Sequence, residues 1–157
     1  IGGCVYTGIS DSLRVGTTGS LMPIQAVGTL LISSFTVGDT YKIRMTGELS
    51  CASNQTLTLT IFGNTTQILT SPVFSMSSST LRPFSLDIDI VLRPDSQIYV
   101  HGAFQYIRSG GTSSEGSFFH NVRNYDNETL VLDIQATFSE HNANRIVSNY
   151  FTLSKIF

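Results

Sequence analysis

Apolar and polar residues alternate along most of the chain with the period of two that a strand with one buried face requires. The longest such run is "YKIRMTGELSC", residues 41–51, in which charged or hydroxyl side chains occupy every even position. The same alternation recurs in residues 55–63, 84–94, 97–108 and 129–139. The residues predicted to face inward are Tyr41, Ile43, Met45, Leu49, Cys51, Leu57, Leu59, Ile61, Phe84, Leu86, Ile88, Ile90, Leu92, Ile98, Val100, Phe104, Tyr106, Leu130, Leu132, Ile134, Ala136 and Phe138.

Turn-forming residues separate these runs at a spacing of roughly 8 to 12 residues. The turn "VGD" precedes the first run, "GNTT" follows the second, and Pro94 ends the third because proline cannot continue a central strand. Shorter apolar runs at residues 28–35 and 67–74, and a final run at residues 145–157, complete the pattern. This rhythm predicts an all-β fold, an antiparallel jelly-roll sandwich of about eight to ten strands, in a single domain over residues 1–157.

The segment 109–128, "SGGTSSEGSFFHNVRNYDNE", breaks the alternation with glycine and serine, and we predict that it is a loop. The glycine-rich residues 16–19 are predicted to form another loop. Loops on a rigid sandwich commonly carry recognition, and mixed aromatic and polar side chains are typical of contact surfaces. The candidate receptor-binding residues are Phe118, Phe119, His120, Arg123, Asn124 and Tyr125. Alternatively, Phe118 and Phe119 pack beneath the loop or in a subunit interface.

The final run is apolar on both faces, which gives it more surface to bury than one half-buried sheet supplies. Tyr150 and Ile156 lie on one face of this predicted strand, and Phe151 and Phe157 lie on the other. We predict that these four residues form the interface of a symmetric homotrimer. The alternative is an internal strand that is covered on both faces within a monomer.

The composition points away from several classes of partner. Of the 157 residues, 41% are hydrophobic and only 13% are charged, so Ser, Thr, Asn and Gln must cover much of the surface. The net charge of -2 provides no basic surface for nucleic acid or an anionic membrane. No apolar run approaches the roughly 18 residues that span a bilayer, so no membrane insertion is expected. The chain begins at Ile1 without a signal-peptide pattern, and we expect residues 1–20 to lead in from an upstream fibrous region.

The histidines and the acidic pair do not match any catalytic or metal-binding spacing. His101, His120 and His141 show neither HxH nor HExxH, and we interpret each as an ordinary strand or loop residue. Asp87 and Asp89 share one strand face, which fits a calcium site or a catalytic dyad, but a solvated outer face is the favoured interpretation. We therefore expect no enzymatic activity, no metal and no cofactor.

The cysteines and three Asn-x-Thr triplets are further candidate modification sites. Cys4 and Cys51 can pair in an oxidising compartment, although two buried thiols are the favoured interpretation. The triplets begin at Asn54, Asn64 and Asn127, each at a predicted turn. In a secretory pathway they would accept glycans, but a chain this rich in Asn and Thr also produces such triplets by chance.

The block "FTVGDTYKIRMTGELSCASNQTLTLTIF", residues 35–62, with the inward row of residues 84–90, resembles the jelly-roll heads at the tips of trimeric viral and phage fibres. Their architecture is similar to that of tumour necrosis factor and complement globular heads. The closing "NYFTLSKIF" also resembles the terminal strand that such heads carry near their three-fold axis. The aromatic signatures of the animal heads are missing, which favours the viral version.

This resemblance implies a non-enzymatic homotrimeric attachment head on the virion surface, in an extracellular setting. Its partner would be a host-surface receptor or glycan. Two alternatives remain open. One is a structural capsid or vertex jelly-roll subunit of a virion, and the other is a secreted cytokine-like or lectin-like binding module.

Overall fold

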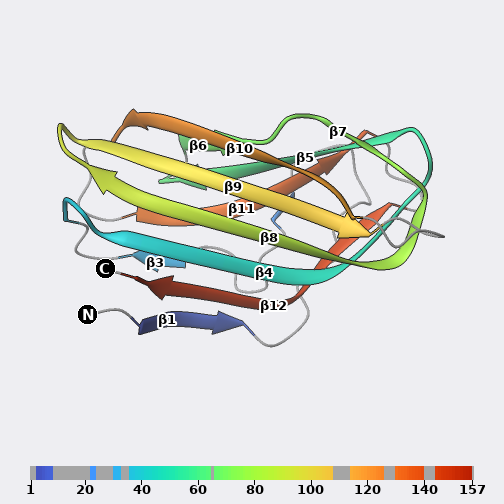
Figure 1. Ribbon diagram of the computed structural model, residues 1–157, viewed down its shortest axis with the longest axis horizontal. Helices are drawn as coiled ribbons and strands as arrows, with labels where there is room; N and C mark the ends of the chain where they lie inside the picture. The colour runs from blue at the N-terminus through green and yellow to red at the C-terminus, as the bar shows by residue number, and fades with distance from the viewer. Residues whose placement is uncertain are drawn as a thin grey trace.

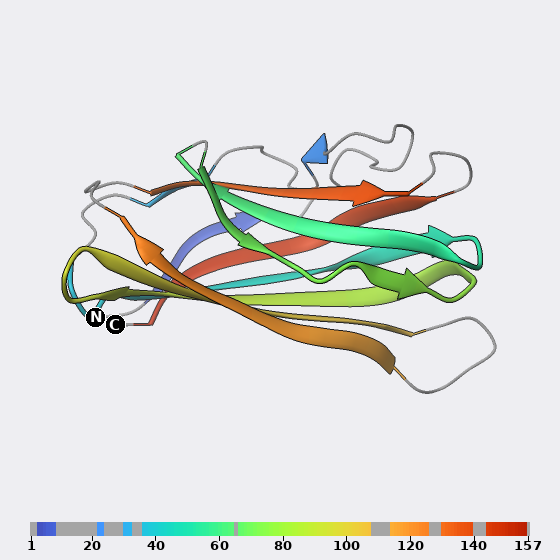
Figure 2. The ribbon, with the colours of Figure 1, turned by 90° about the horizontal axis from the view of Figure 1, so that it is seen from above.

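The structure is a computed structural model that describes residues 3–8, 22–23, 30–32, 36–64, 66–107, 114–125, 130–139 and 144–156. These residues form twelve strands and, within the described ranges, no helix. The strands lie in two antiparallel sheets that pack face to face, as Figures 1 and 2 show. The predicted all-β sandwich is confirmed.

The first sheet has the order β1-β12-β4-β8-β9-β10, comprising β1 (Gly3–Gly8), β12 (Arg145–Lys155), β4 (Thr40–Cys51), β8 (Ser79–Arg93), β9 (Gln97–Ile107) and β10 (Ser114–Asn124). The second has the order β2-β11-β5-β6, comprising β2 (Met22–Pro23), β11 (Leu130–Phe138), β5 (Gln55–Gly63) and β6 (Thr66–Thr70). In addition, β3 (Leu30–Ile32) pairs with β11, and β7 (Phe74–Met76) pairs with β5. The twelve strands are more than the predicted eight to ten. Three of them, β2, β3 and β7, are short strands of only two or three residues each.

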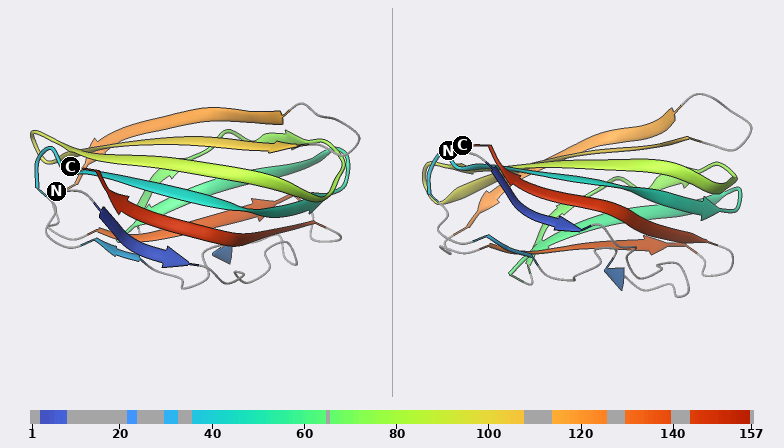
Figure 3. Two further views of the ribbon diagram at one scale, coloured as in Figure 1. Left: turned by 60° about the horizontal axis from the view of Figure 1, so that its bottom comes forward. Right: turned by 90° about the horizontal axis from the view of Figure 1, so that it is seen from below.

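The strand pairs are nested along the chain, which is the wrapping pattern of a jelly roll. β1 pairs with β12, β3 with β11, β4 with β8, and β5 with β6. Successive pairs alternate between the two sheets, and Figure 3 shows β1 and β12 side by side at one edge. The hairpin of β9 and β10 is inserted between β8 and β11 and extends the first sheet beyond this wrap. The predicted jelly-roll fold is therefore confirmed.

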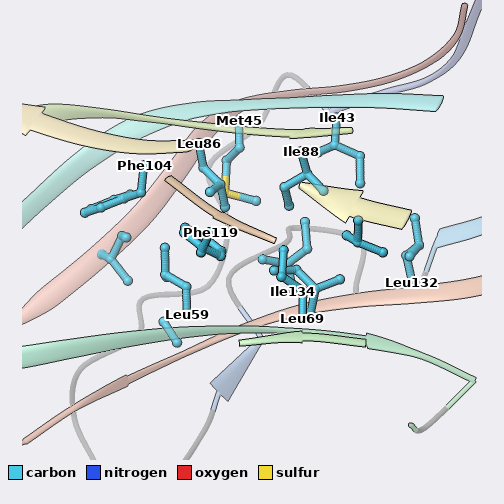
Figure 4. Close-up of a cluster of buried hydrophobic side chains, with 14 of the residues drawn as sticks. Ile43, Met45, Leu59, Leu69, Leu86, Ile88, Phe104, Phe119, Leu132 and Ile134 are labelled. Carbon is cyan, nitrogen blue, oxygen red and sulfur yellow. The ribbon is translucent and has the colours of Figure 1, made fainter. Parts of the chain in front are cut away.

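The core lies between the sheets and consists of the predicted inward rows. Along β11 every second residue is buried, and β4 shows the same alternation. Figure 4 shows Met45 and Leu86 of the first sheet facing Leu59 and Ile134 of the second. Each fully buried aliphatic side chain contributes about 1.5 to 3 kcal/mol relative to exposure, so these rows are the main source of stability.

The turn before β4 is held by a buried carboxylate. Thr36 N donates to Asp39 Oδ2 at 2.9 Å, and Lys155 Nζ lies 3.3 Å from Asp39 Oδ1. Gly38 has a φ of 90°, which a glycine adopts without strain. Burial alone would raise the pKa of Asp39, but the hydrogen bonds from Thr36 and the ammonium of Lys155 outweigh it and hold that pKa below its ordinary 3.8. The carboxylate thus ties the end of β12 to this turn.

The predicted loop over residues 109–128 is wrong for most of its length. Residues 114–124 form β10, which pairs with β9 along its whole length, while residues 108–113 and 126–129 lie outside the described residues. The sequence of β10 does not alternate between apolar and polar residues, because some inward-facing residues of this edge strand are polar and bind the second sheet through hydrogen bonds. Asn121 Nδ2 donates to the carbonyl oxygen of Ile68 on β6 at 2.9 Å. The other predicted loop, residues 16–19, also lies outside the described residues.

The two cysteines lie at opposite ends of the first sheet. Cys4 is opposite Ser154 on β12, and Ser154 is opposite Lys42 on β4. Cys51 lies further along β4 than Lys42 by a stretch of strand about 30 Å long. A disulfide requires Cα atoms within roughly 7 Å, so the two cysteines of one chain cannot pair. Instead, the buried Cys51 thiol donates to the carbonyl oxygen of Ser77 at 3.2 Å.

Candidate functional site

Strand geometry divides the six candidate receptor-binding residues into two groups. Because side chains alternate along β10, the even-numbered candidates are exposed on the outer face of the first sheet, and the odd-numbered ones turn toward the second sheet. The outer group is Phe118, His120 and Asn124, and the inner group is Phe119, Arg123 and Tyr125. The six residues do not form one surface.

Phe118 is the last ring of a row on the outer face of β9 and β10. Its side chain is 71% exposed, and its ring centroid lies 6.0 Å from that of His101. Tyr99 lies 6.4 Å from His101 and 6.1 Å from His120, measured between ring centroids. We call Tyr99, His101, Phe118 and His120 the aromatic face. A hollow of about 430 Å³ lies beside it, lined by Ala103, Phe104, Gln105, Gly116, Ser117 and Phe118.

The sequence did not indicate Tyr99 or His101 as site residues. The sequence predicts an ordinary strand histidine at His101, yet this residue lies directly opposite His120 in the register of the two strands. The signal was present, since two rings occupy consecutive outward positions on β9 and two more on β10. It becomes visible only once β9 and β10 are known to pair.

Charged residues beside the aromatic face form an alternating pattern across neighbouring strands. Asp89 on β8 is opposite His101 on one side and opposite Lys42 of β4 on the other. Asp87 is likewise opposite Arg44. Opposite charges directly across a strand pair stabilise a sheet. Both aspartates are half-buried, and Asp87 Oδ1 is buried without a hydrogen-bond partner among the described residues, so the favoured interpretation of a solvated face does not hold for Asp87.

Phe119 lies in the core, beneath the aromatic face. It is 7% exposed, and its ring meets Phe74 edge-on with centroids 6.2 Å apart. Directly across the strand pair is Gly102, whose missing side chain leaves room for the ring. Of the alternatives that the sequence left open, packing inside the chain is the one observed for Phe119.

The remaining candidates line a second hollow, at the far end of β10. This cavity of about 300 Å³ lies between the end of β10 and the turn joining β5 to β6. Asn64 Nδ2 donates to the Tyr125 hydroxyl oxygen at 2.7 Å, and Arg123 Nη1 donates to the carbonyl oxygen of Gln67. We call this cavity the polar cleft; its lining residues are Gly63, Asn64, Thr66, Ile68, Arg123, Asn124 and Tyr125.

The four predicted trimer-interface residues also differ in their exposure. Tyr150 on β12 and Ile156, the residue after β12, are each 42% exposed. Phe151 is only 1% exposed and packs in the chain's own core. Phe157 lies outside the described residues. Among the three described candidates, Tyr150 and Ile156 are therefore the ones available to a partner.

The described residues form neither a metal-binding cluster nor a membrane-spanning helix. In the described part of the chain, no three His, Cys, Asp or Glu side chains gather closely enough to hold a metal ion; His141 lies outside that part. None of the described segments is a helix of the length and apolar character needed to cross a membrane.

The Asn-x-Thr triplets differ in accessibility. The Asn64 amide is engaged at both ends, since its Oδ1 also accepts a hydrogen bond from Val131 N at 2.8 Å. Asn54 is exposed in the turn between β4 and β5, and Asn127 lies outside the described residues. A glycan on Asn64 would be attached to Nδ2, the atom that donates to Tyr125, and would disturb that contact, which favours a chance match at that triplet.

No family model and no curated protein matches this chain. Among solved structures, a GH43 glycoside hydrolase with an engineered active site is similar at 10% identity and a TM-score of 0.40, over 87% of this chain and 36% of that one. The marine PL-14 alginate lyase from Aplysia kurodai is similar at 9% identity and a TM-score of 0.37, over 79% of this chain and 70% of that one. This chain thus spans little more than a third of the length of the glycoside hydrolase. Likenesses this remote carry no conclusion about activity.

Proposed function

We propose that this chain is a non-enzymatic binding domain that attaches to a surface receptor or glycan through the aromatic face. The observation that carries the proposal is the position of Phe118, a largely exposed ring in the middle of a paired strand. It contacts His101 and borders a hollow of about 430 Å³. Single exposed apolar residues are common, but a connected row of rings beside a hollow is typical of contact surfaces.

The chemistry of the aromatic face fits a saccharide best. A sugar ring has an apolar face of C–H groups, which packs on aromatic rings, and a rim of hydroxyl groups. The imidazoles of His101 and His120 and the Tyr99 hydroxyl can donate and accept hydrogen bonds at that rim. A paired hairpin within a six-stranded sheet holds these groups in fixed positions, which lowers the entropic cost of binding.

As the setting for this activity, we propose the head of a trimeric viral fibre, as the sequence resemblance implies. The nested jelly-roll order supports this proposal, as do the outward positions of Tyr150 and Ile156. Three identical weak sites on one head would bind a multivalent surface with much higher avidity than one site alone.

The test is a glycan array probed with labelled wild-type protein and with Phe118→Ala, together with binding to intact cells. We expect selective binding by the wild type and its loss in the variant. Val73→Ala is the matched control, because Val73 is also an exposed apolar residue but precedes β7 on the second sheet. Equal binding by wild type and Phe118→Ala would refute the proposal.

A further inference from the structure

We propose that the polar cleft is a second binding site, which takes a saccharide carrying an anionic group, either a carboxylate or a sulfate. The cleft shares no lining residue with the aromatic face or its hollow. Along β10, His120 is the member of the aromatic face nearest to Asn124, four positions away, a separation of about 13 Å along a strand. The proposal therefore stands independently of the proposed function of the aromatic face.

The charge of the cleft favours an anion. Arg123 is the one charged residue among its seven described lining residues. Its bond to the carbonyl oxygen of Gln67 anchors the guanidinium, and this uses one of the five N–H donors that the group carries. The planar fork of a guanidinium matches the paired oxygens of a carboxylate or sulfate, so Arg123 would bind the anionic group directly.

The other lining residues fit a sugar ring. Thr66 and Asn124 are exposed and can exchange hydrogen bonds with hydroxyl groups. Tyr125 is 8% exposed and supplies a small apolar surface for the C–H groups, whereas Ile68 is buried. A volume of about 300 Å³ is at the lower end of the range for small-molecule sites, which fits one sugar residue rather than a long chain.

The wall of the cleft is fixed by contacts from three parts of the chain. Asn64 is in the left-handed region with a φ of 50°, and its backbone N donates to the carbonyl oxygen of Val131 at 2.9 Å. Its side chain also accepts from Val131 N and donates to the Tyr125 hydroxyl oxygen. Tyr125 N donates to the carbonyl oxygen of Ser96 at 2.6 Å. The wall is thus formed before any ligand binds, which favours affinity.

The test is a titration of the isotope-labelled chain, followed by two-dimensional NMR, with four probes: glucuronic acid, glucose 6-sulfate, glucose and inorganic sulfate. We expect both acidic sugars to shift the amide signals of Thr66, Arg123 and Asn124, and to bind roughly tenfold more tightly than glucose. Arg123→Gln should abolish this preference, whereas Arg123→Lys should keep part of it, because lysine retains the charge but not the fork.

Two variants separate a lost site from a damaged fold. Arg123→Gln also loses the bond to Gln67, so Asn124→Ala is the second variant; it should weaken both acidic sugars several-fold while the melting temperature stays unchanged. Phe118→Ala should leave the titration unaltered, so failure of the aromatic-face proposal is distinguishable. Equal binding of glucose and glucuronic acid, or unaltered binding by Arg123→Gln, would overturn the proposal. Inorganic sulfate binding as tightly as glucose 6-sulfate would reduce the cleft to an adventitious anion site and overturn it too.

Discussion

The ring of Phe119 occupies the space that a side chain on Gly102 would need. A Cβ built on Gly102 would lie 2.6 Å from Phe119 Cε2, well inside contact distance. The two residues face each other across β9 and β10, so this contact fixes which face of β10 turns inward. Because neighbouring residues of a strand point to opposite faces, inward Phe119 places Phe118 and His120 outward. One core contact thereby orients the aromatic face.

The first prediction concerns that contact. Gly102→Ala should displace the ring of Phe119 and reduce the free energy of unfolding by about 1 to 3 kcal/mol, the usual cost of an overpacked core. Urea unfolding measures this, with Gln105→Ala on the exposed side of the same strand as the control. If Gly102→Ala were as stable as the wild type, Phe119 would not depend on the space at Gly102.

A second prediction concerns acid stability and Asp39. Because the folded-state pKa of Asp39 is lowered, its stabilising contribution is complete at neutral pH and is lost as the pH falls through that pKa, below 3.8. Asp39→Asn should lower the free energy of unfolding by about 1 to 3 kcal/mol at neutral pH, and by progressively less in acid. Urea unfolding across this pH range measures the difference, and Asp95→Asn in the exposed turn after β8 is the control. A difference that stayed constant down to strong acid would contradict the role of the Asp39 carboxylate.

The cysteines lead to a third prediction. Because Cys4 and Cys51 lie at opposite ends of the first sheet, protein purified without reductant and then unfolded should take up alkyl groups on both thiols. Mass spectrometry of the alkylated chain is the measurement. A chain of monomer mass that resisted alkylation until a reductant was added would contain a Cys4–Cys51 disulfide and would contradict the strand register.

The fourth prediction concerns the proposed trimer. The double variant Tyr150→Ser with Ile156→Ser should convert a native trimer to monomers without disturbing the core, as measured by native mass spectrometry. Phe151→Ala, by contrast, should lower the free energy of unfolding by about 3 to 5 kcal/mol, because that ring is buried in its own chain. Wild-type protein that is monomeric at micromolar concentration would contradict the trimer proposal.

The strands with one face in the core could be predicted from the sequence, and an edge strand could not. Along β4, odd positions meet the core and even positions meet water, so residue type follows burial. Along β10 the inward residues include Asn121 and Arg123, which bind carbonyl oxygens of β6 rather than packing in the core. Their polarity removed the alternation, and the segment therefore looked like a loop.

The candidate site was predicted in composition but not in arrangement. Successive residues of a strand point to opposite faces, but a loop has no such rule. The predicted loop therefore groups Phe118 with Phe119, although Phe118 is exposed and Phe119 is buried. Tyr99 and His101 join Phe118 only through the pairing of β9 with β10, and Asn64 meets Tyr125 only through the fold. Contacts between residues this distant in sequence depend on strand register, which local pattern does not specify.

The most direct test of the proposed attachment function is the dissociation constant of wild type, Phe118→Ala and Phe118→Tyr for the best ligand of the array. Phe118→Ala should bind about tenfold or more weakly at an unchanged melting temperature, since the side chain is exposed and its loss leaves the core intact. Phe118→Tyr keeps an aromatic ring and should bind nearly as well as the wild type. Equal dissociation constants for wild type and Phe118→Ala would contradict recognition through the aromatic face.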